Sequence, residues 1–293
     1  MSLSKFDYYS PGTVEEASRL LLDIGEDAFL LAGGTDLLVK RNHGMCHPKA
    51  VISLNNITDL DVIKFARKKG LTIGAGARLA DVEAHRDIKR HYPAVAYAAS
   101  QTANTQIRNM GTVAGNLCNA APSAENAPTL MAMNAEVVLF GQNGERRLPL
   151  EDFFKGPGLT DIQPGEVLTA IFVPVPPAKS GTSYQHISAR GRVDISAVCV
   201  STMIVLNGGR CEEVRVVLGA VAPVPMRATK AEKILRGKKA SQDFIEKAAE
   251  QASKESKPIS DVRASAEYRK SMVRVLTKRA LNEALERARN AKG

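Results

Sequence analysis

Two glycine-rich segments of the sequence have the composition of loops that bind a phosphate group. They are Leu-Ala-Gly-Gly-Thr-Asp-Leu at residues 31–37 and Gln-Ile-Arg-Asn-Met-Gly-Thr-Val-Ala-Gly-Asn at residues 106–116. A tight turn without bulky side chains lets backbone amides converge on an anion such as a pyrophosphate, and Thr35 and Thr112 add hydroxyl donors. Neither segment is a P-loop or a G-x-G-x-x-G fingerprint, and residues 74–79 lack the third glycine of the latter. The pattern alone leaves a nucleotide-like ligand and two structural turns as equal alternatives.

The cysteines and histidines do not form a recognisable metal site. The four cysteines stand far apart without a C-x-x-C pair, so we expect reduced thiols and neither an iron–sulfur cluster nor a structural zinc held by this chain alone. His43, Cys46 and His47 place three ligands on a short stretch without a fourth, and we interpret them as a surface loop near a subunit contact. The sequence shows no Ser/His/Asp or paired-carboxylate arrangement, so we assign no acid–base catalyst.

Of the 293 residues, 44% are hydrophobic and 24% are charged, which is typical of a soluble globular protein with a hydrophobic core. The first residues lack a secretion signal, and no apolar run reaches the about 18 residues of a membrane span, so we expect a cytoplasmic protein. The net charge of +9 comes from residues 226–293, which hold 18 Lys and Arg against 9 Asp and Glu. Because acids alternate with these bases along helical patterns, we favour a solvated or protein-docking face over nucleic-acid binding.

The elements that must position the two segments alternate between helix and strand. Thr13 and Glu16 form a capping box at the start of a helical pattern that runs to Ile24. Residues 29–32 read as a short buried strand that ends at the first segment, and Asn143-Gly144 is a strong hairpin turn. The other expected strands are residues 51–54, 62–65, 71–73, 135–140, 147–150 and 168–173, and the expected helices are residues 79–86, 94–101 and 128–133.

A proline-rich stretch, Pro-Val-Pro-Pro-Ala-Lys-Ser-Gly at residues 174–181, interrupts the pattern. We therefore predict a first domain of residues 1–177, divided into subdomains of about 1–56 and 57–177, and a second domain of residues 178–293. Strand-like stretches at residues 184–187, 195–206 and 211–218 precede helical patterns that run from Ala228 to the end. The predicted fold class is α+β.

The two segments also resemble sequence motifs of one family. Residues 31–37 resemble the first FAD loop of molybdenum hydroxylase flavin subunits, such as the medium subunits of carbon monoxide dehydrogenase and bacterial xanthine dehydrogenases. Residues 106–116 resemble their second loop, and Ala-Pro-Ser-Ala-Glu-Asn-Ala-Pro at residues 121–128 resembles the segment that follows it. The resemblance covers nearly the whole chain. It implies a two-subdomain FAD-binding domain of the PCMH (vanillyl-alcohol oxidase-like) type and a C-terminal domain with a three-stranded antiparallel sheet and helices.

The same resemblance implies which residues contact FAD. The two loops would surround the pyrophosphate and the ribityl chain, Glu125 would hydrogen-bond the cofactor, and Leu168 would approach the adenine. Cys118 and the pair Asp194-Ile195 would border the flavin ring. The implied cofactor-binding residues are Ala32, Gly33, Gly34, Thr35, Asp36, Leu37, Gly111, Thr112, Gly115, Asn116, Cys118, Glu125, Leu168, His186, Asp194 and Ile195.

Two positions depart from the family pattern. His186 stands where some relatives have a cofactor-contacting lysine, so a direct charge contact is not implied there. Ala114 stands where a glycine is commoner, and we expect its methyl group to tighten the second loop slightly rather than to abolish binding.

The function that the resemblance implies is that of an oxidoreductase subunit relaying electrons. A large partner subunit would carry the molybdenum cofactor and a small one two [2Fe-2S] clusters, in a dimer of heterotrimers. The FAD of this chain would take electrons from the clusters and pass them to NAD or another acceptor. Two alternatives stay open: a stand-alone flavin reductase of the same fold, which would need its own acid catalyst, and a basic nucleotide- or nucleic-acid-binding module without redox activity.

Overall fold

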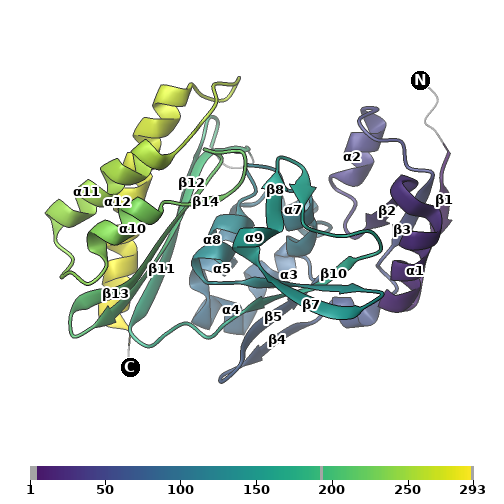
Figure 1. Cartoon of the computed structure of the whole chain (residues 1–293), viewed down its shortest axis with the longest axis horizontal. Coiled ribbons are helices and arrows are strands. Elements are labelled where there is room, and N and C mark those ends of the chain that lie inside the picture. Colours follow the sequence, from purple (N-terminus) through teal and green to yellow (C-terminus); the bar gives the residue numbers. More distant parts are fainter. Residues whose placement is uncertain (1–4, 192–193, 292–293) are drawn as a thin grey trace.

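The computed structural model describes residues 5–191 and 194–291, which form one two-stranded sheet and three larger sheets arranged along the long axis of the molecule (Figure 1). A small sheet lies at one end, a five-stranded sheet lies in the middle, and a C-terminal sheet with its helices lies at the other end. One hydrophobic core joins the small sheet to the middle sheet, whereas the C-terminal sheet has a core of its own.

The small sheet has the order β1-β3-β2, and its strands run parallel. The central strand β3 (Ala50–Ser53) is buried along its whole length. Helix α1 (Val14–Ile24) begins after Thr13, whose hydroxyl accepts the Glu16 amide at 3.2 Å, while the Glu16 carboxylate accepts the Gly12 amide at 3.0 Å. The predicted capping box is thus confirmed. The other elements here are β1 (Asp7–Tyr9), η1 (Gly25–Asp27), β2 (Ala28–Leu31), α2 (Leu37–Asn42) and η2 (Thr58–Leu60).

The middle sheet has the order β4-β5-β10-β6-β7, with every neighbouring pair antiparallel. The predicted hairpin at Asn143-Gly144 is confirmed, the expected strands at residues 62–65 and 71–73 form a second hairpin, and β10 (Val167–Val173) lies between the two. The last strand of this region therefore holds the two hairpins together. The hairpin strands are β4 (Ile63–Ala66), β5 (Gly70–Gly74), β6 (Glu136–Gly141) and β7 (Gly144–Pro149), and the short strands β8 (Phe154–Gly156) and β9 (Leu159–Thr160) pair separately.

The helices of this middle region are short and lie between the hairpins in the sequence. They are α3 (Leu79–Ala84), α4 (Arg86–His91), α5 (Pro93–Gln101), α6 (Thr105–Arg108), α7 (Val113–Cys118), α8 (Asn126–Ala132) and α9 (Leu150–Phe153). Every residue of α8 is buried, and this helix packs against the C-terminal sheet. Helices α5 and α8 therefore form the contact between the middle region and the C-terminal sheet.

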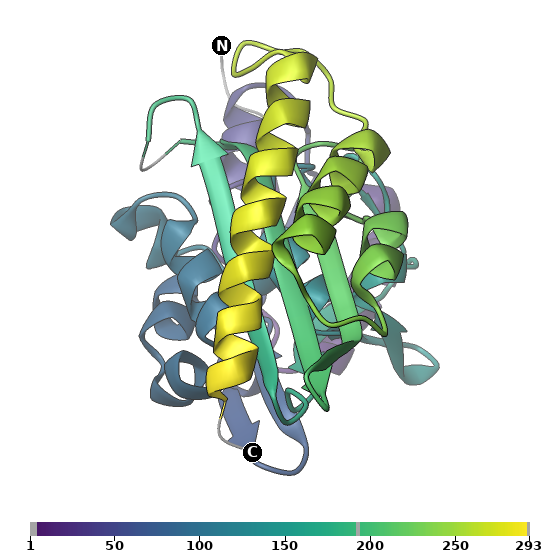
Figure 2. The ribbon, with the colours of Figure 1, turned by 90° about the vertical axis from the view of Figure 1, so that its left-hand side faces the viewer.

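The C-terminal sheet has the antiparallel order β11-β12-β13-β14. The central strand β12 (Ser196–Asn207) is buried over its first ten residues because helices cover one face and α8 covers part of the other. Figure 2 shows the C-terminal helices lying across the outer face of the sheet. The remaining elements are β11 (Ser180–Ser188), β13 (Arg210–Gly219), β14 (Met226–Arg227), α10 (Thr229–Leu235), α11 (Gln242–Glu255) and α12 (Ala266–Asn290).

The structure differs from the sequence-based expectation in local details. The helix expected over residues 79–86 is divided into α3 and α4, because His85 adopts an extended backbone. Strand β2 is half-buried rather than buried, because it is an edge strand whose side chains face a cavity. The three expected C-terminal strands are joined by a fourth, the two-residue β14.

Candidate functional site

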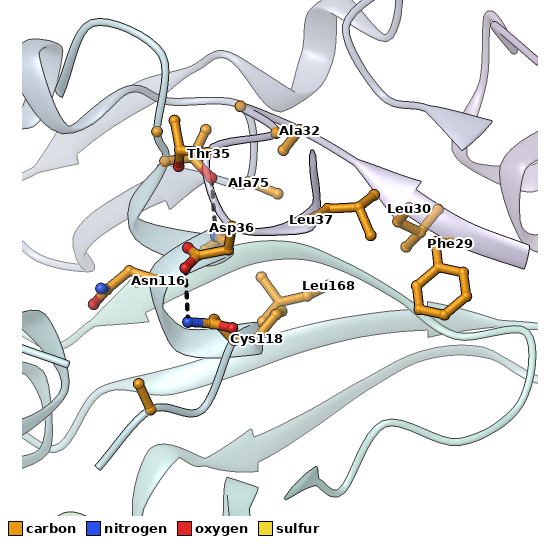
Figure 3. Close-up of a pocket in the computed structure, with 18 of the residues that line it drawn as sticks. Phe29, Leu30, Ala32, Thr35, Asp36, Leu37, Ala75, Asn116, Cys118 and Leu168 are labelled. Atoms are coloured by element: carbon orange, nitrogen blue, oxygen red, sulfur yellow. Dashed lines mark hydrogen bonds between the residues drawn. The ribbon is translucent and has the colours of Figure 1, made fainter. Parts of the chain in front are cut away.

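A cavity of ≈ 1220 Å³ is lined by residues of both the small sheet and the middle region. It is larger than the about 300–1,000 Å³ of ordinary ligand sites, which suits an extended ligand. Figure 3 shows Leu30 and Leu168 toward one end and Asp36 and Asn116 toward the other. Every predicted site residue except His186 lines this cavity.

The first glycine-rich loop leaves β2 at Ala32 and enters α2 at Leu37. Gly33 packs directly on the second loop, because a Cβ atom at this position would lie 2.1 Å from the carbonyl oxygen of Met110. Gly34 has a φ of +72°, a left-handed conformation that glycine adopts without steric cost. The two glycines therefore bring bare backbone, rather than side chains, to the cavity wall.

The second glycine-rich loop contains two short helices rather than an open turn. Asn104 caps α6 with a hydrogen bond of 2.8 Å, and the Thr112 hydroxyl accepts the Gly115 amide at the start of α7 at 2.9 Å. The Gly111 carbonyl accepts the Leu79 amide at 2.9 Å, which ties the loop to α3. Thr112 thus serves as a helix cap, and the first amides of α7 are left without intrahelical acceptors.

A polar bridge at the cavity wall joins the first loop and α2 to the end of α7. The Nζ atom of Lys40 donates to Oδ1 of Asn119 at 2.6 Å, and the Asn119 amide donates to Oδ1 of Asp36 at 3.0 Å. Desolvation raises the pKa of Asp36, and the positive charge of Lys40 lowers it in part. Lys40 and Asn119 were not among the predicted site residues. The spacing could have indicated Lys40, because it follows Asp36 by four residues, and opposite charges at this spacing lie on the same face of a helix.

Apolar side chains line the other part of the cavity. Leu168 comes from β10, and Phe29 and Leu30 come from the edge strand β2 (Figure 3). Residues 162–166, which connect β9 to β10, complete this part of the lining. Phe29 and Leu30 were expected in a buried strand. They were not predicted as site residues because the sequence does not indicate that β2 forms a sheet edge beside the first loop.

The remaining wall combines Glu125 with the start of the C-terminal sheet. Glu125 is 8% exposed, and its Oε1 atom accepts a hydrogen bond of 3.3 Å from the Ser196 hydroxyl. Burial raises the pKa of Glu125 to about 7. Asp194 and Ile195 also line the cavity, and the Asp194 carboxylate binds the Arg190 guanidinium at 3.2 Å. This wall therefore carries an acid that can be neutral near neutral pH.

Cys118 and His186 differ in their relation to the cavity. Cys118 lines it, and burial raises the pKa of its thiol to about 12, so the thiol stays protonated. His186 lies behind the wall: its Nδ1 atom is 3.4 Å from the Ser196 hydroxyl and its Nε2 atom is 3.2 Å from Oε1 of Gln101. Ser196 therefore separates His186 from Glu125, a connection that no local sequence pattern indicated.

The side chains of the loop at residues 43–47 contact the backbone of the preceding helix α2. The ring of His43 contacts the Val39 carbonyl at 2.9 Å, and the Cys46 thiol, which lines the cavity, approaches the Leu37 carbonyl at 3.9 Å. Within residues 5–191 and 194–291, no group of three His, Cys, Asp or Glu side chains is placed to hold a metal ion. Across the helices of those same ranges, none combines the length and the apolar character of a membrane span.

Comparisons with known proteins match the whole chain. Residues 4–176 match the family model of the FAD binding domain in molybdopterin dehydrogenase, and residues 183–284 match that of the CO dehydrogenase flavoprotein C-terminal domain. The chain is 31% identical to the xanthine dehydrogenase FAD-binding subunit of Escherichia coli, with 96% of each chain covered. It is 33% identical to the carbon monoxide dehydrogenase medium chain of Afipia carboxidovorans, with 97% of this chain and 98% of the relative covered.

The fold agrees with these matches. A solved structure of carbon monoxide dehydrogenase from Hydrogenophaga pseudoflava superimposes with a TM-score of 0.94 at 33% identity, over 98% of this chain and 99% of the other. The predicted fold class, with its FAD-binding and C-terminal flavoprotein parts, is thereby confirmed. The chain belongs to the family of FAD-binding subunits of the molybdenum hydroxylases, the oxidoreductases that include the xanthine and carbon monoxide dehydrogenases.

Proposed function

We propose that the cavity holds one FAD in an extended form and that the chain relays electrons through it within a larger complex. The observation that carries this proposal is the convergence of both glycine-rich loops and of residues 121–125 on one cavity of ≈ 1220 Å³. The close packing of Gly33 on Met110 supports it, since this contact keeps side chains away from the point where the loops meet.

The pyrophosphate would lie where the two loops meet. The residues that would hold it are Gly33 to Leu37 and Gly111 to Asn116, with backbone amides as the donors. The Lys40 ammonium, at the cavity wall, would balance the negative charge. Hydrogen bonds to a charged group contribute about 1.5–3 kcal/mol each, so a few such donors account for firm retention of a diphosphate.

The two ends of the cavity suit the two ends of the cofactor. Leu168 with Phe29 and Leu30 offers an apolar surface for the adenine. Glu125, Cys118 and the pair Asp194-Ile195 would border the isoalloxazine ring, with a neutral Cys118 thiol acting as a small apolar group. His186 would act on this end through Ser196 rather than by direct contact.

The bound FAD supplies the redox chemistry, and this chain orients it and shields it from water. We infer that electrons come from two [2Fe-2S] clusters of a small partner subunit, after a large subunit with the molybdenum cofactor has oxidised the substrate. NAD or another acceptor would receive them, and the complex would be a dimer of heterotrimers. Two relatives support this setting: one is a medium chain of carbon monoxide dehydrogenase, and the other is an FAD-binding subunit of xanthine dehydrogenase.

Cofactor release tests the binding step. Denaturing the purified chain should release about one FAD per chain, identified by chromatography, because a cavity with two amide-rich loops fits a diphosphate rather than a monophosphate flavin. Release of FMN would contradict the proposal, and a well-folded colourless protein would favour a nucleotide-binding module without redox activity.

The relay itself is tested in two steps. The isolated, dithionite-reduced chain should pass electrons to a tetrazolium dye but should oxidise no organic substrate, and native mass spectrometry of the complex should identify the two partner subunits and their cofactors. Turnover of an organic substrate by the isolated chain would instead support a stand-alone flavin reductase.

A further inference from the structure

A row of polar side chains leads from the cavity wall into the contact between the middle region and the C-terminal sheet. It begins at Glu125, which lines the cavity, and continues to Ser196, which is 1% exposed. The Ser196 hydroxyl lies 3.3 Å from Oε1 of Glu125 and 3.4 Å from Nδ1 of His186. The row ends at Gln101, whose Oε1 atom lies 3.2 Å from Nε2 of the half-buried His186. These contacts form a continuous hydrogen-bonded path.

The contacts at Gln101 decide which atoms of the path donate and which accept. The Gln101 amide nitrogen donates to the Ser100 hydroxyl at 2.8 Å, which turns its oxygen toward His186. That oxygen only accepts, so Nε2 of His186 carries the proton and Nδ1 faces the Ser196 hydroxyl as an acceptor. Ser196 has one hydrogen and two acceptors. It donates to Glu125 when the carboxylate is charged and to His186 when Glu125 is protonated.

The two titratable groups of the path have pKa values shifted toward one another. Burial raises the pKa of Glu125 to about 7, and burial also lowers the pKa of His186 below its ordinary value. Burial thus favours the neutral form of both groups.

The other titratable groups around the path cannot compete for its proton. Tyr184 on β11 stacks on the His186 ring at 5.7 Å, and Cys199 on β12 is fully buried. Burial raises the pKa of both groups, so they stay neutral. On α5, Tyr97 packs edge-on against Tyr184 at 6.2 Å.

We propose that Glu125, Ser196 and His186 form a proton path between the cavity and the solvent, with Gln101 fixing the tautomer of the histidine. The proposal rests on the proposed function, because two-electron reduction of a flavin takes up at least one proton. The electrons come from the partner's clusters. The protonated His186 gives the proton on Nδ1 to Ser196 while the hydroxyl hydrogen of Ser196 passes to the Glu125 carboxylate. One proton has then moved and both end groups are neutral. The half-buried His186 regains a proton from solvent at Nδ1 when its ring turns away from Ser196.

The first test measures proton uptake by the FAD-loaded chain during rapid photoreduction, with a pH-indicator dye in weak buffer. His186→Gln and Ser196→Ala should slow proton uptake by at least about tenfold, since a positioned acid–base group typically contributes 10²–10⁴-fold. Their FAD content should not change, because neither side chain lines the cavity. His91→Gln is the matched control, since this half-buried ring stacks on Phe65 at 4.5 Å away from the path. Added imidazole should restore uptake in His186→Ala, a recovery that a structural role does not predict.

A second measurement is independent of the cofactor. In the flavin-free chain, the infrared carbonyl band of protonated Glu125, assigned with Glu125→Gln, should exchange with deuterium more slowly in His186→Gln and Ser196→Ala than in the control. Unchanged uptake and unchanged exchange overturn the path even if FAD is bound. If the chain holds no FAD, the proposed function fails and the exchange rates alone decide: slower exchange supports the path and equal exchange overturns it.

Discussion

Lys40 and Asn119 lie 79 residues apart in the sequence, yet their side chains form a hydrogen bond of 2.6 Å at the wall of the cavity. The bond joins helix α2, which follows the first glycine-rich loop, to the end of α7 in the second. Asn119 also donates a hydrogen bond to Asp36. Its amide side chain therefore holds both the Lys40 ammonium and the Asp36 carboxylate in place. Among the residues that the structure describes, Lys40 forms no ion pair, so its charge is presented to the cavity.

Lys40→Met should weaken FAD binding by about tenfold, because a charge-assisted hydrogen bond contributes about 1.5–3 kcal/mol and each 1.4 kcal/mol is a factor of ten. Fluorescence titration of the flavin-free protein with FAD measures the affinity at two salt concentrations. The variant should also lose part of the salt dependence. Lys64→Met, on the exposed side of β4, serves as the control. Equal affinities of the two variants would show that Lys40 is remote from the phosphates.

Gly33→Ala should lower FAD content sharply while the chain stays folded. Its methyl group would lie 2.1 Å from the Met110 carbonyl oxygen, so the two loops must separate at a cost of about 1–3 kcal/mol. The flavin absorbance per chain and the melting temperature measure the two effects. Gly12→Ala is a matched control, because no atom lies within 4 Å of a Cβ atom there. Full flavin content in Gly33→Ala would mean that the loop contact does not shape the site.

Glu125→Gln should remove a pH dependence of stability. The pKa of Glu125 is raised from 4.5 to about 7, so the folded state binds the proton more tightly than the unfolded state. Its stabilising contribution is fully present below pH 4.5 and is lost as the pH rises through about 7. The loss amounts to about 3 kcal/mol, since one pKa unit corresponds to 1.36 kcal/mol.

Urea unfolding of the flavin-free protein between pH 5 and pH 8 measures this contribution. The wild-type chain should lose stability with rising pH relative to Glu125→Gln, whereas Glu286→Gln, an exposed substitution, should follow the wild type. Parallel curves for the wild type and Glu125→Gln would show that Glu125 is ionised in the folded chain throughout this range.

Arg269→Met should destabilise the start of the C-terminal sheet by about 2–3 kcal/mol, because buried acceptors would lose a charged donor. Arg269 is 3% exposed and donates to the carbonyls of Ala197 and Ala220 at 2.6 and 3.0 Å. It also binds the Asp261 carboxylate at 2.7 Å. Unfolding in urea is the measurement, with the exposed Lys270→Met as the control. A loss no greater than that of the control would contradict the assigned role.

The sequence was most informative where a local rule decides the structure. The Thr13 cap and the Asn143-Gly144 hairpin turn follow from nearest-neighbour chemistry and could be predicted. The two glycine-rich loops could be predicted to lie at one site only because of their resemblance to a family. Pattern alone left two structural turns as an equal alternative.

The rest depends on contacts between distant residues, which a local pattern does not encode. Lys40 meets Asn119 only because two sheets pack together, and Ser196 connects Glu125 to His186 only because β12 lies against α8. The half-burial of β2 has the same origin, since the position of a strand at a sheet edge depends on the pairing of all three strands. Side-chain placement at His186 could not be predicted because its polar partners, Gln101 and Ser196, come from other elements of the fold.

The meeting of two loops from different sheets at Gly33 and Met110 has a consequence for the life of the protein in the cell. A molecule that fills the cavity clamps the small sheet onto the rest of the chain, and at a thousand times its dissociation constant it adds about 4 kcal/mol to stability. Without that molecule, the small sheet opens more often and exposes its backbone to proteases. The supply of FAD would then govern how long each newly made chain survives before it is degraded.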